Sequence, residues 1–381
     1  MTVAARRAAV LGKPIAHSLS PVIHNAGYAA AGLTGWSYTR IECAAAELPD
    51  LVAGLGPEWA GLSVTMPGKE AALTVAAEVS PVAAAVGAAN TLVRRPDGTW
   101  YADNTDVTGM VDVLTSAGGA SAPRVVSGAA GAGTPSGAGG LGEVSGRGDR
   151  GVDTGAGRLG LVSGVRDLGV ESGGVGPGSP SGGGPGTVSG IGGPGAVSDA
   201  GGAVSALGAG GAVTGLGAGA AAAVVGAGAT VTVLGAGGTA RAALAAAARL
   251  GATGVTVVAR RRAAVDELAP VATALGLALT AAPWADAVAL TDVDLLISTV
   301  PKGAADELAG VVRWRPTTVL FDAIYDPWPT PLAASAAAVG CPVVSGLDLL
   351  LAQAVGQFEQ FTGVPAPRAA MAAALTAARV D

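Results

Sequence analysis

Apolar residues follow two periods along this chain, one typical of strands and one typical of helices. Short runs of aliphatic and β-branched residues predict strands at 8–12, 36–42, 61–65, 89–95, 100–104, 231–234, 255–260, 292–301, 317–327 and 341–346. Apolar positions three and four apart predict helices at 21–32, 45–55, 70–79, 105–118, 240–250, 262–276, 331–340, 347–363 and 371–380. Because strands and helices alternate, we expect an α/β protein with two lobes and mainly parallel sheets.

The pattern breaks down between the two lobes, at 118–228. This segment contains 39 of the 62 glycines of the chain and has no aromatic residue, lysine, histidine, cysteine, methionine, asparagine or glutamine. Its few bulky apolar side chains cannot offset the cost of ordering the backbone, which is roughly 1–2 kcal/mol per residue. We therefore expect a disordered, low-complexity insertion rich in Gly, Ala, Ser and Val.

The stretch 231–240, VTVLGAGGTA, runs from a predicted strand through a glycine turn into a helix. In such a turn Gly235 allows the tight bend, Gly237 leaves room for phosphates, and Ala240 lets the helix pack closely on the strand. The N–H groups and the positive dipole end of the helix then face the phosphates. This pattern predicts a dinucleotide site, whereas the similar GLGAGA at 215–220 follows no strand.

The residues after the next strand indicate which dinucleotide is bound. An NAD site places a carboxylate there for the ribose 2′-hydroxyl, and an NADP site places arginine there for the 2′-phosphate. This chain has Ala259 followed by Arg260, Arg261 and Arg262, with no acid before Asp266. Guanidinium groups bind phosphate well, so NADP is favoured.

Composition excludes several other classes of protein. The formal net charge of −6 leaves no basic footprint for nucleic acid. The high hydropathy comes from Ala, Val and Gly, so we expect no membrane span, and the first fifteen residues do not form a signal peptide. Cys43 and Cys341 match no metal-ligand spacing and indicate reduced thiols of a cytoplasmic protein.

A lysine and an aspartate in the first lobe are candidates for acid–base chemistry. Lys69 follows a predicted strand, and Asp106 begins a predicted helix. An ammonium held by a carboxylate stabilises developing negative charge where a hydroxyl becomes a ketone, and it relays the proton. Spacing alone leaves the alternative of two unrelated surface charges open.

Serines and histidines near the N-terminus are weaker candidates. Ser18 and Ser20 lie in a loop before a predicted helix, a place that suits an anion such as a carboxylate, although simple capping by Ser20 explains them equally well. His17 and His24 have no acidic neighbour, so we interpret both as structural and expect no metal site.

Six motifs occur in an order that identifies a family. IAHSLSP, GLSVTMPGKE, VGAANTL, ADNTD, VLGAGGTARAAL and GLDLLLAQAVGQFE resemble, in sequence order, the motifs of the shikimate dehydrogenase family. The second motif differs from the commoner NVT-x-PFK form: Ser63 replaces Asn and Gly68 replaces Phe, which resembles an actinobacterial variant. Ala259 stands where the family usually has Asn.

The resemblance implies a role for each matching residue. Lys69 and Asp106 correspond to the catalytic pair. The implied substrate ligands are Ser18 and Ser20 for the carboxylate, Thr65, Asn90 and Gln353 for the ring hydroxyls, and Tyr325 near the carboxylate. The implied cofactor-binding residues are Gly235, Ala236, Gly237, Gly238, Thr239, Arg260 and Arg261.

The resemblance also implies the domain plan. Residues 1–117 would form the substrate-binding domain, completed by C-terminal helices from 346–381, and 229–345 would form the Rossmann domain. Because Gln353 lies on a C-terminal helix, that helix should return to the first lobe and help close a cleft.

The implied activity is the NADP-dependent, reversible reduction of 3-dehydroshikimate to shikimate in the pathway to chorismate and the aromatic amino acids. Two alternatives stay open, an NAD-dependent quinate/shikimate dehydrogenase and a non-catalytic regulatory paralogue that binds dinucleotide. The sequence also leaves a homodimer open.

Overall fold

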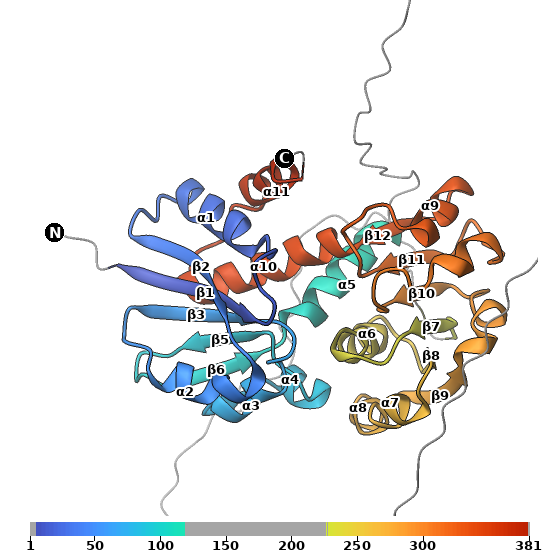
Figure 1. Ribbon diagram of the computed structural model, residues 1–381, viewed down its shortest axis with the longest axis horizontal. Coiled ribbons are helices and arrows are strands. Elements are labelled where there is room, and N and C mark those ends of the chain that lie inside the picture. Colours follow the sequence, from blue (N-terminus) through green and yellow to red (C-terminus); the bar gives the residue numbers. More distant parts are fainter. Residues whose placement is uncertain (1–4, 119–225, 227, 380–381) are drawn as a thin grey trace, which may run out of the picture. The chain divides into compact units, whose positions relative to one another are not determined.

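Two six-stranded sheets organise the residues that the computed structural model describes, which are 5–118, 226 and 228–379 (Figure 1). These residues belong to one compact unit. The α/β class expected from the alternation of strands and helices is confirmed. The predicted insertion at 118–228 lies, apart from its ends, outside the described residues.

The first sheet is mixed and has the strand order β2-β1-β3-β5-β6-β4. β5 runs antiparallel to β3 and also to β6, with which it forms a hairpin through the turn at 96–98, and the other pairs are parallel. Its strands are β1 (Arg6–Gly12), β2 (Trp36–Glu42), β3 (Trp59–Val64), β4 (Glu78–Val79), β5 (Thr91–Arg94) and β6 (Trp100–Asp103). The helices of this part are α1 (Ser20–Ala30), η1 (Ala45–Glu47), α2 (Leu48–Ala53), α3 (Ala71–Val75), α4 (Pro81–Val86) and α5 (Thr105–Gly118).

The second sheet is parallel throughout and has the order β12-β11-β10-β7-β8-β9. Its strands are β7 (Val231–Leu234), β8 (Gly254–Ala259), β9 (Ala278–Pro283), β10 (Leu295–Ser298), β11 (Val319–Asp322) and β12 (Val343–Ser345). The intervening helices are α6 (Gly238–Arg249), α7 (Arg262–Asp266), α8 (Ala269–Ala274), η2 (Trp284–Asp286), η3 (Val288–Leu290), η4 (Asp306–Gly310) and α9 (Pro331–Ala338). Doubly wound sheets of this kind bind ligands at the carboxyl ends of their strands.

The last two helices return to the first sheet. α10 (Gly346–Thr362) and α11 (Arg368–Ala377) bury Phe358, Phe361 and Met371 in one cluster with apolar residues of β1 and α1. A Cβ at Gly61 of β3 would collide with the ring of Phe361, so glycine is what allows α10 to approach this closely. The expected return of the Gln353 helix to the first sheet is therefore observed.

Several segments differ from the sequence prediction; the strand expected at 317–327, for example, covers only Val319–Asp322. The helix expected at 70–79 ends at Val75, and β4 follows it. The helix expected at 262–276 is divided into α7 and α8, with Pro270 at the start of α8. β9 was not predicted, because its small and half-exposed side chains carry no strand period.

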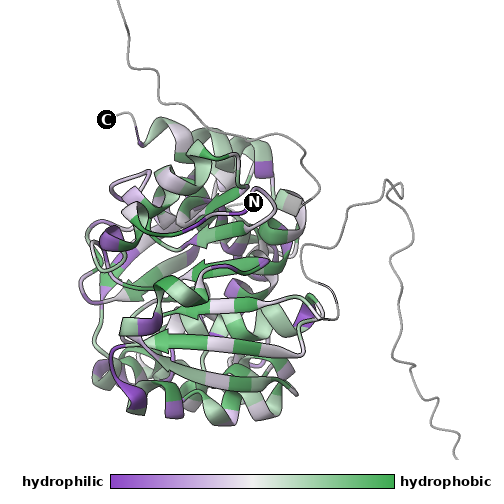
Figure 2. Ribbon diagram, turned by 90° about the vertical axis from the view of Figure 1, so that its right-hand side faces the viewer, coloured by the Kyte–Doolittle hydropathy of each residue, from purple (hydrophilic) through white to green (hydrophobic). Residues whose placement is uncertain are grey.

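Hydropathy follows this architecture. The strands are mostly green in Figure 2, and the purple residues lie mainly on helices and loops at the surface. Within the described ranges, no helix combines the length and the apolar character needed to cross a membrane.

Candidate active site

Lys69 and Asp106 form an ion pair at the carboxyl end of β3. Lys69 follows the turn after β3, which Gly68 closes by donating its N–H to the carbonyl of Thr65. Asp106 lies in the first turn of α5, and its Oδ2 is 2.6 Å from Lys69 Nζ. The two side chains are only 19% and 11% exposed, so water competes little with this charge-assisted hydrogen bond.

Asn90 lies at the same edge, because β5 runs antiparallel to β3 and begins where β3 ends. Its side chain is buried, and its Oδ1 accepts hydrogen bonds from Thr91 Oγ1 at 2.7 Å and from the Thr105 N–H at 2.8 Å. These donors leave Asn90 Nδ2 to face Gln353 Oε1 of α10, at 3.4 Å. The structure thus brings together two residues that are 263 positions apart.

The loop after β1 carries Ser18 and Ser20. Ser18 Oγ accepts from the Ser20 N–H at 3.3 Å, and Arg40 of β2 donates from Nε to the Ser18 carbonyl at 2.9 Å. Capping by Ser20 is not seen, because α1 begins at Ser20 itself and its N-cap, Leu19, has no capping side chain. Ser18 and Arg40 therefore fix the loop instead.

Thr65 and Tyr325 reach the region from opposite parts of the chain. Thr65 directly follows β3, and its methyl group occupies the space that a Cβ at Gly12 would need. Tyr325 follows β11 and packs against the apolar cluster that contains Ile15 and Leu19 of the serine loop. Burial raises the pKa of Tyr325, so its hydroxyl remains a hydrogen-bond donor near neutral pH.

The predicted glycine turn joins β7 to α6. Gly235 has a φ of +100°, and an added Cβ would lie 2.7 Å from Thr299 Oγ1. Around Gly237 and Gly238, by contrast, an added Cβ would meet no heavy atom within 4 Å. Gly237 is the N-cap of α6 and provides no side chain to its first N–H groups, so this cradle fits a pyrophosphate.

The three arginines after β8 are exposed at the carboxyl end of that strand. Arg262 Nε is 2.8 Å from Asp266 Oδ1, one helical turn further on. Arg260 and Arg261 thus stand beside the glycine cradle's strand, because β8 is the neighbour of β7. The residues present fit a dinucleotide that carries a 2′-phosphate.

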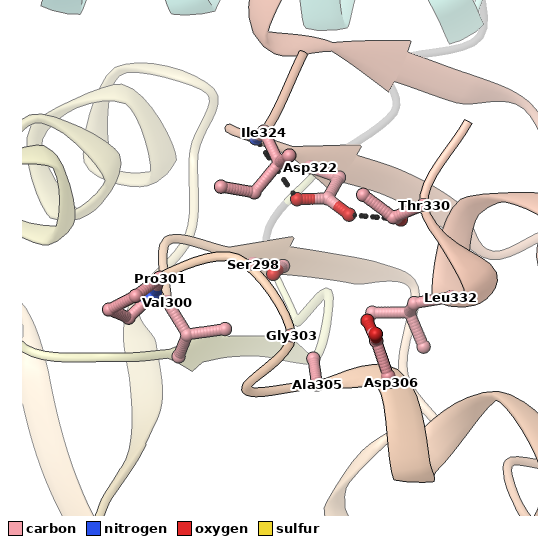
Figure 3. A pocket seen from close by; sticks show the side chains of 10 residues that line it. All are labelled: Ser298, Val300, Pro301, Gly303, Ala305, Asp306, Asp322, Ile324, Thr330 and Leu332. Atoms are coloured by element: carbon pink, nitrogen blue, oxygen red, sulfur yellow. Dashed lines mark hydrogen bonds between the residues drawn. The ribbon is translucent and has the colours of Figure 1, made fainter. Parts of the chain in front are cut away.

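A small pocket that the sequence did not indicate lies at the carboxyl ends of β10 and β11 (Figure 3). It has room for about one water molecule. Asp322 accepts hydrogen bonds from Thr330 Oγ1 at 2.7 Å and from the Ile324 N–H at 3.2 Å, and burial raises its pKa. Ser298 and Asp322 are the last residues of two neighbouring strands, β10 and β11. A polar residue at the end of each buried strand is the sequence signal that could have indicated this pocket.

A second contact that the sequence did not indicate joins α6 to the segment around Lys69. Arg241 Nη2 lies 3.3 Å from Glu70 Oε1, and Arg241 Nη1 donates to the Val86 carbonyl at 3.4 Å. Gly87 follows with a φ of +68°, and an added Cβ there would approach the same guanidinium. The helix with the glycine cradle is therefore tied to the residue next to Lys69.

His24 has a structural environment, as expected. It is completely buried and stacks on Tyr38 with ring centroids 4.1 Å apart and an interplanar angle of 4°. Burial lowers the pKa of His24 to about 3, so the ring is neutral at physiological pH. No cluster of three or more metal-ligating side chains occurs in the part of the chain that the structure describes.

Comparison with known protein families gives two matches. The shikimate dehydrogenase substrate binding domain matches residues 10–92, and the shikimate 5′-dehydrogenase C-terminal domain matches residues 346–376. Both matched regions contribute residues to the edge described above, Asn90 from the first and Gln353 from the second.

Individual proteins are similar over different shares of the chain. The NADP(+) shikimate dehydrogenase of Methylobacterium radiotolerans is 46% identical over 129 residues, which are 34% of this chain and 45% of that protein. The chain thus spans less than half the length of the curated relatives that it matches.

Solved structures match more completely. The crystal structure of Mycobacterium tuberculosis shikimate dehydrogenase is 38% identical, with a TM-score of 0.63, and the match covers 98% of this chain and 99% of that one. Quinate dehydrogenase from Corynebacterium glutamicum, in complex with NAD, has the same TM-score and 19% identity over 98% of this chain and 100% of that one. At 19% identity, the similarity to quinate dehydrogenase shows only that the fold is shared.

Proposed function

This chain belongs to the shikimate dehydrogenase family, and on that premise we propose that it catalyses the NADP-dependent, reversible reduction of 3-dehydroshikimate to shikimate. The observation that carries the proposal is the ion pair of Lys69 and Asp106, which lies at the same sheet edge as the amides of Asn90 and Gln353. An acid–base pair beside hydrogen-bonding amides is what a hydroxylated ring with one reacting carbon requires.

We assign substrate binding to three groups of side chains. Ser18 and Ser20 offer hydroxyl donors to the ring carboxylate. Asn90 Nδ2 and Gln353 Oε1 offer one donor and one acceptor to ring hydroxyls, and Thr65 adds a hydroxyl beside Lys69. Tyr325 extends the carboxylate site, since its ring packs against the cluster that supports the serine loop.

Lys69 and Asp106 carry the proton chemistry in this proposal. The Lys69 ammonium donates a proton to the carbonyl oxygen as negative charge develops there, and Asp106 holds the ammonium in place from 2.6 Å. In the reverse direction Lys69 withdraws the proton from the hydroxyl. NADPH, when bound, supplies the hydride.

NADP rather than NAD is our assignment for the cofactor. The cradle of Gly235, Ala236, Gly237, Gly238 and Thr239 would hold the pyrophosphate. Arg260 and Arg261 would hold the 2′-phosphate, since the end of β8 bears exposed guanidinium groups and no carboxylate. Ala259 stands where the family usually has Asn, so this chain lacks one polar side chain that would lie near the adenosine.

We also place this activity in the cytoplasm, where the buried thiols of Cys43 and Cys341 would remain reduced.

The test is the oxidation of NADPH by 3-dehydroshikimate, with the reverse reaction run on shikimate and on quinate with NADP+ and with NAD+. We expect turnover to be fastest with the shikimate and NADP+ pair. Preference for quinate and NAD+ would support the first alternative. A chain that binds NADPH but turns over none of these pairs would support the regulatory paralogue and overturn the proposal.

A further inference from the structure

A chain of buried hydrogen bonds lies behind the Asn90 amide. The Tyr38 hydroxyl of β2 donates to Ser63 Oγ of β3 at 2.5 Å, and Ser63 Oγ donates to Gln357 Oε1 of α10 at 2.6 Å. Gln357 Nε2 donates to the Asn90 carbonyl at 3.0 Å and to Thr91 Oγ1 at 3.1 Å. Thr91 Oγ1 then donates to Asn90 Oδ1 at 2.7 Å.

These hydrogen bonds can run in only one direction. The Asn90 carbonyl can only accept, so the Nε2 end of Gln357 must face it and the Oε1 end must face Ser63. Ser63 therefore donates its single hydroxyl proton to Gln357 and accepts a hydrogen bond from Tyr38. Burial raises the pKa of Tyr38 far above its usual value, so the phenol keeps the proton that it donates.

The direction of the chain reaches the Asn90 side chain. Thr91 Oγ1 accepts from Gln357, and Asn90 Oδ1 at 2.7 Å is a nearer acceptor for its own proton than Thr105 Oγ1 at 3.2 Å. With the two Thr105 donors added, Oδ1 accepts three hydrogen bonds from the protein. A flipped amide would place Nδ2 against the main-chain N–H of Thr105, which can only donate. Nδ2 is therefore held toward Gln353.

The Thr105 N–H sets which end of the Asn90 amide faces the substrate. We propose that Ser63 and Gln357 are positioning residues that, through Thr91, hold this amide in place, so that the enzyme selects a ring hydroxyl able to accept from Asn90 and donate to Gln353. The inference rests on the proposed function. A ring position that lacks this hydroxyl leaves both amides unpaired, which is costly in a buried site.

Ser63 is the residue that joins Tyr38 to Gln357 in this chain of hydrogen bonds. The commoner family motif has Asn at this position, and the short serine side chain leaves room for the Tyr38 hydroxyl. Ser63, Tyr38 and Gln357 are 4%, 2% and 0% exposed, so no water needs to complete the chain of hydrogen bonds. A buried network with every member paired gives one rigid arrangement.

The experiment compares Ser63→Ala with Ser63→Thr, which keeps the hydroxyl. Discrimination is measured as kcat/KM for shikimate divided by kcat/KM for analogues that each lack one ring hydroxyl. We expect Ser63→Ala to lower this ratio about tenfold for one analogue, through a higher KM for shikimate with kcat changed less than threefold. Ser63→Thr should keep the ratio of the natural chain.

Ser80→Ala is the matched control. Ser80 is also 4% exposed, and it caps α4 by accepting from the Ala83 N–H at 3.0 Å, outside the chain of hydrogen bonds. It should lose stability as Ser63→Ala does, without any change in the discrimination ratio. Equal ratios in Ser63→Ala and the natural chain, or equal loss of discrimination in Ser80→Ala, would overturn the inference.

A second measurement separates this inference from the proposed function. The side-chain amide protons of Asn90 are followed by NMR, which needs no turnover. One sharp pair of signals is expected in the natural chain and in Ser63→Thr, and broadened or doubled signals are expected in Ser63→Ala. Unchanged signals in Ser63→Ala would overturn the inference even in an active enzyme. Absence of turnover together with the expected signals would overturn only the proposed function.

Discussion

The two sheets of this molecule bury different kinds of side chain. Around the first sheet the interior contains amides and hydroxyls that bond to one another, such as Ser63, Asn90 and Gln357. Around the second sheet the buried polar side chains are hydroxyls and the Asp322 carboxylate, with no buried amide among residues 228–345, and α6 alone buries six alanines and a leucine. Each sheet nevertheless ends in a candidate binding site at the carboxyl edge of its strands.

Under the proposed function, the difference follows from what each edge would recognise. A small hydroxylated ring has to be read by donors and acceptors at fixed places, so the first sheet needs polar side chains with no freedom to turn. A pyrophosphate can be held by main-chain N–H groups, so the second sheet needs side chains removed at the glycine turn. The first site would thus depend on polar side chains, whereas the second would depend on the absence of side chains at its glycines.

Replacing Lys69 by alanine should produce the largest effect, because it removes the proposed proton donor of the first site. We expect kcat to fall about 10²–10⁴-fold while KM changes far less, as for an interaction gained mainly in the transition state. Steady-state kinetics in both directions measure this, with circular dichroism as the folding control. An unchanged kcat would remove Lys69 from the mechanism.

Alanine at two glycines of the second site should separate backbone strain from ligand clearance. Gly235→Ala forces a side chain into a φ of +100° and 2.7 Å from Thr299 Oγ1, so the free energy of unfolding should fall by about 2–3 kcal/mol. Gly237→Ala has a φ of −97° and open space, so stability should hold while NADPH binding weakens. Urea unfolding and NADPH titration measure the two effects. Equal stability losses in both variants would contradict the distinction.

Acid should weaken the first part of the molecule through His24. Its pKa is about 3 in the folded protein and about 6.5 when exposed, so between these values the unfolded chain binds more protons. The free energy of unfolding should therefore fall as pH falls, by about 2 kcal/mol between pH 7 and pH 5. His24→Phe, which keeps a ring beside Tyr38, should flatten this slope in urea unfolding curves. A slope that persists in the variant would assign the acid sensitivity to other groups.

Local patterns were enough to predict most of the secondary structure. The alternating run at 36–42 is β2 with the same bounds, and the amphipathic run at 347–363 is α10 to within a residue at each end. The failures are places where the local signal is weak: β9 has small side chains, and Pro270 divides a helical run. Such segments take their form from the neighbouring β8 and α6 rather than from their own sequence.

The candidate site was only partly predictable. Lys69 and Asp106 could be predicted as a candidate acid–base pair, because one is a charged residue after a predicted strand and the other a charged residue at the start of a predicted helix. The structure places them in contact. The partnership of Ser63 with Gln357 spans 294 positions and depends on how α10 packs through Gly61. No period or spacing encodes such a contact. The Arg241 link to Glu70 was missed for the same reason.

The return of α10 and α11 to the first sheet has a consequence for synthesis on the ribosome. The chain makes β1 and α1 first, but Phe358, Phe361 and Met371, which cover them, are among the last residues to be made. Until then an apolar face that includes Ile23 and Tyr28 has no cover, a state that attracts chaperones or aggregates. Gln353 and Gln357 arrive on the same helix. Burial of that face and assembly of the proposed substrate site therefore become a single late event, so an unfinished chain would hold no substrate.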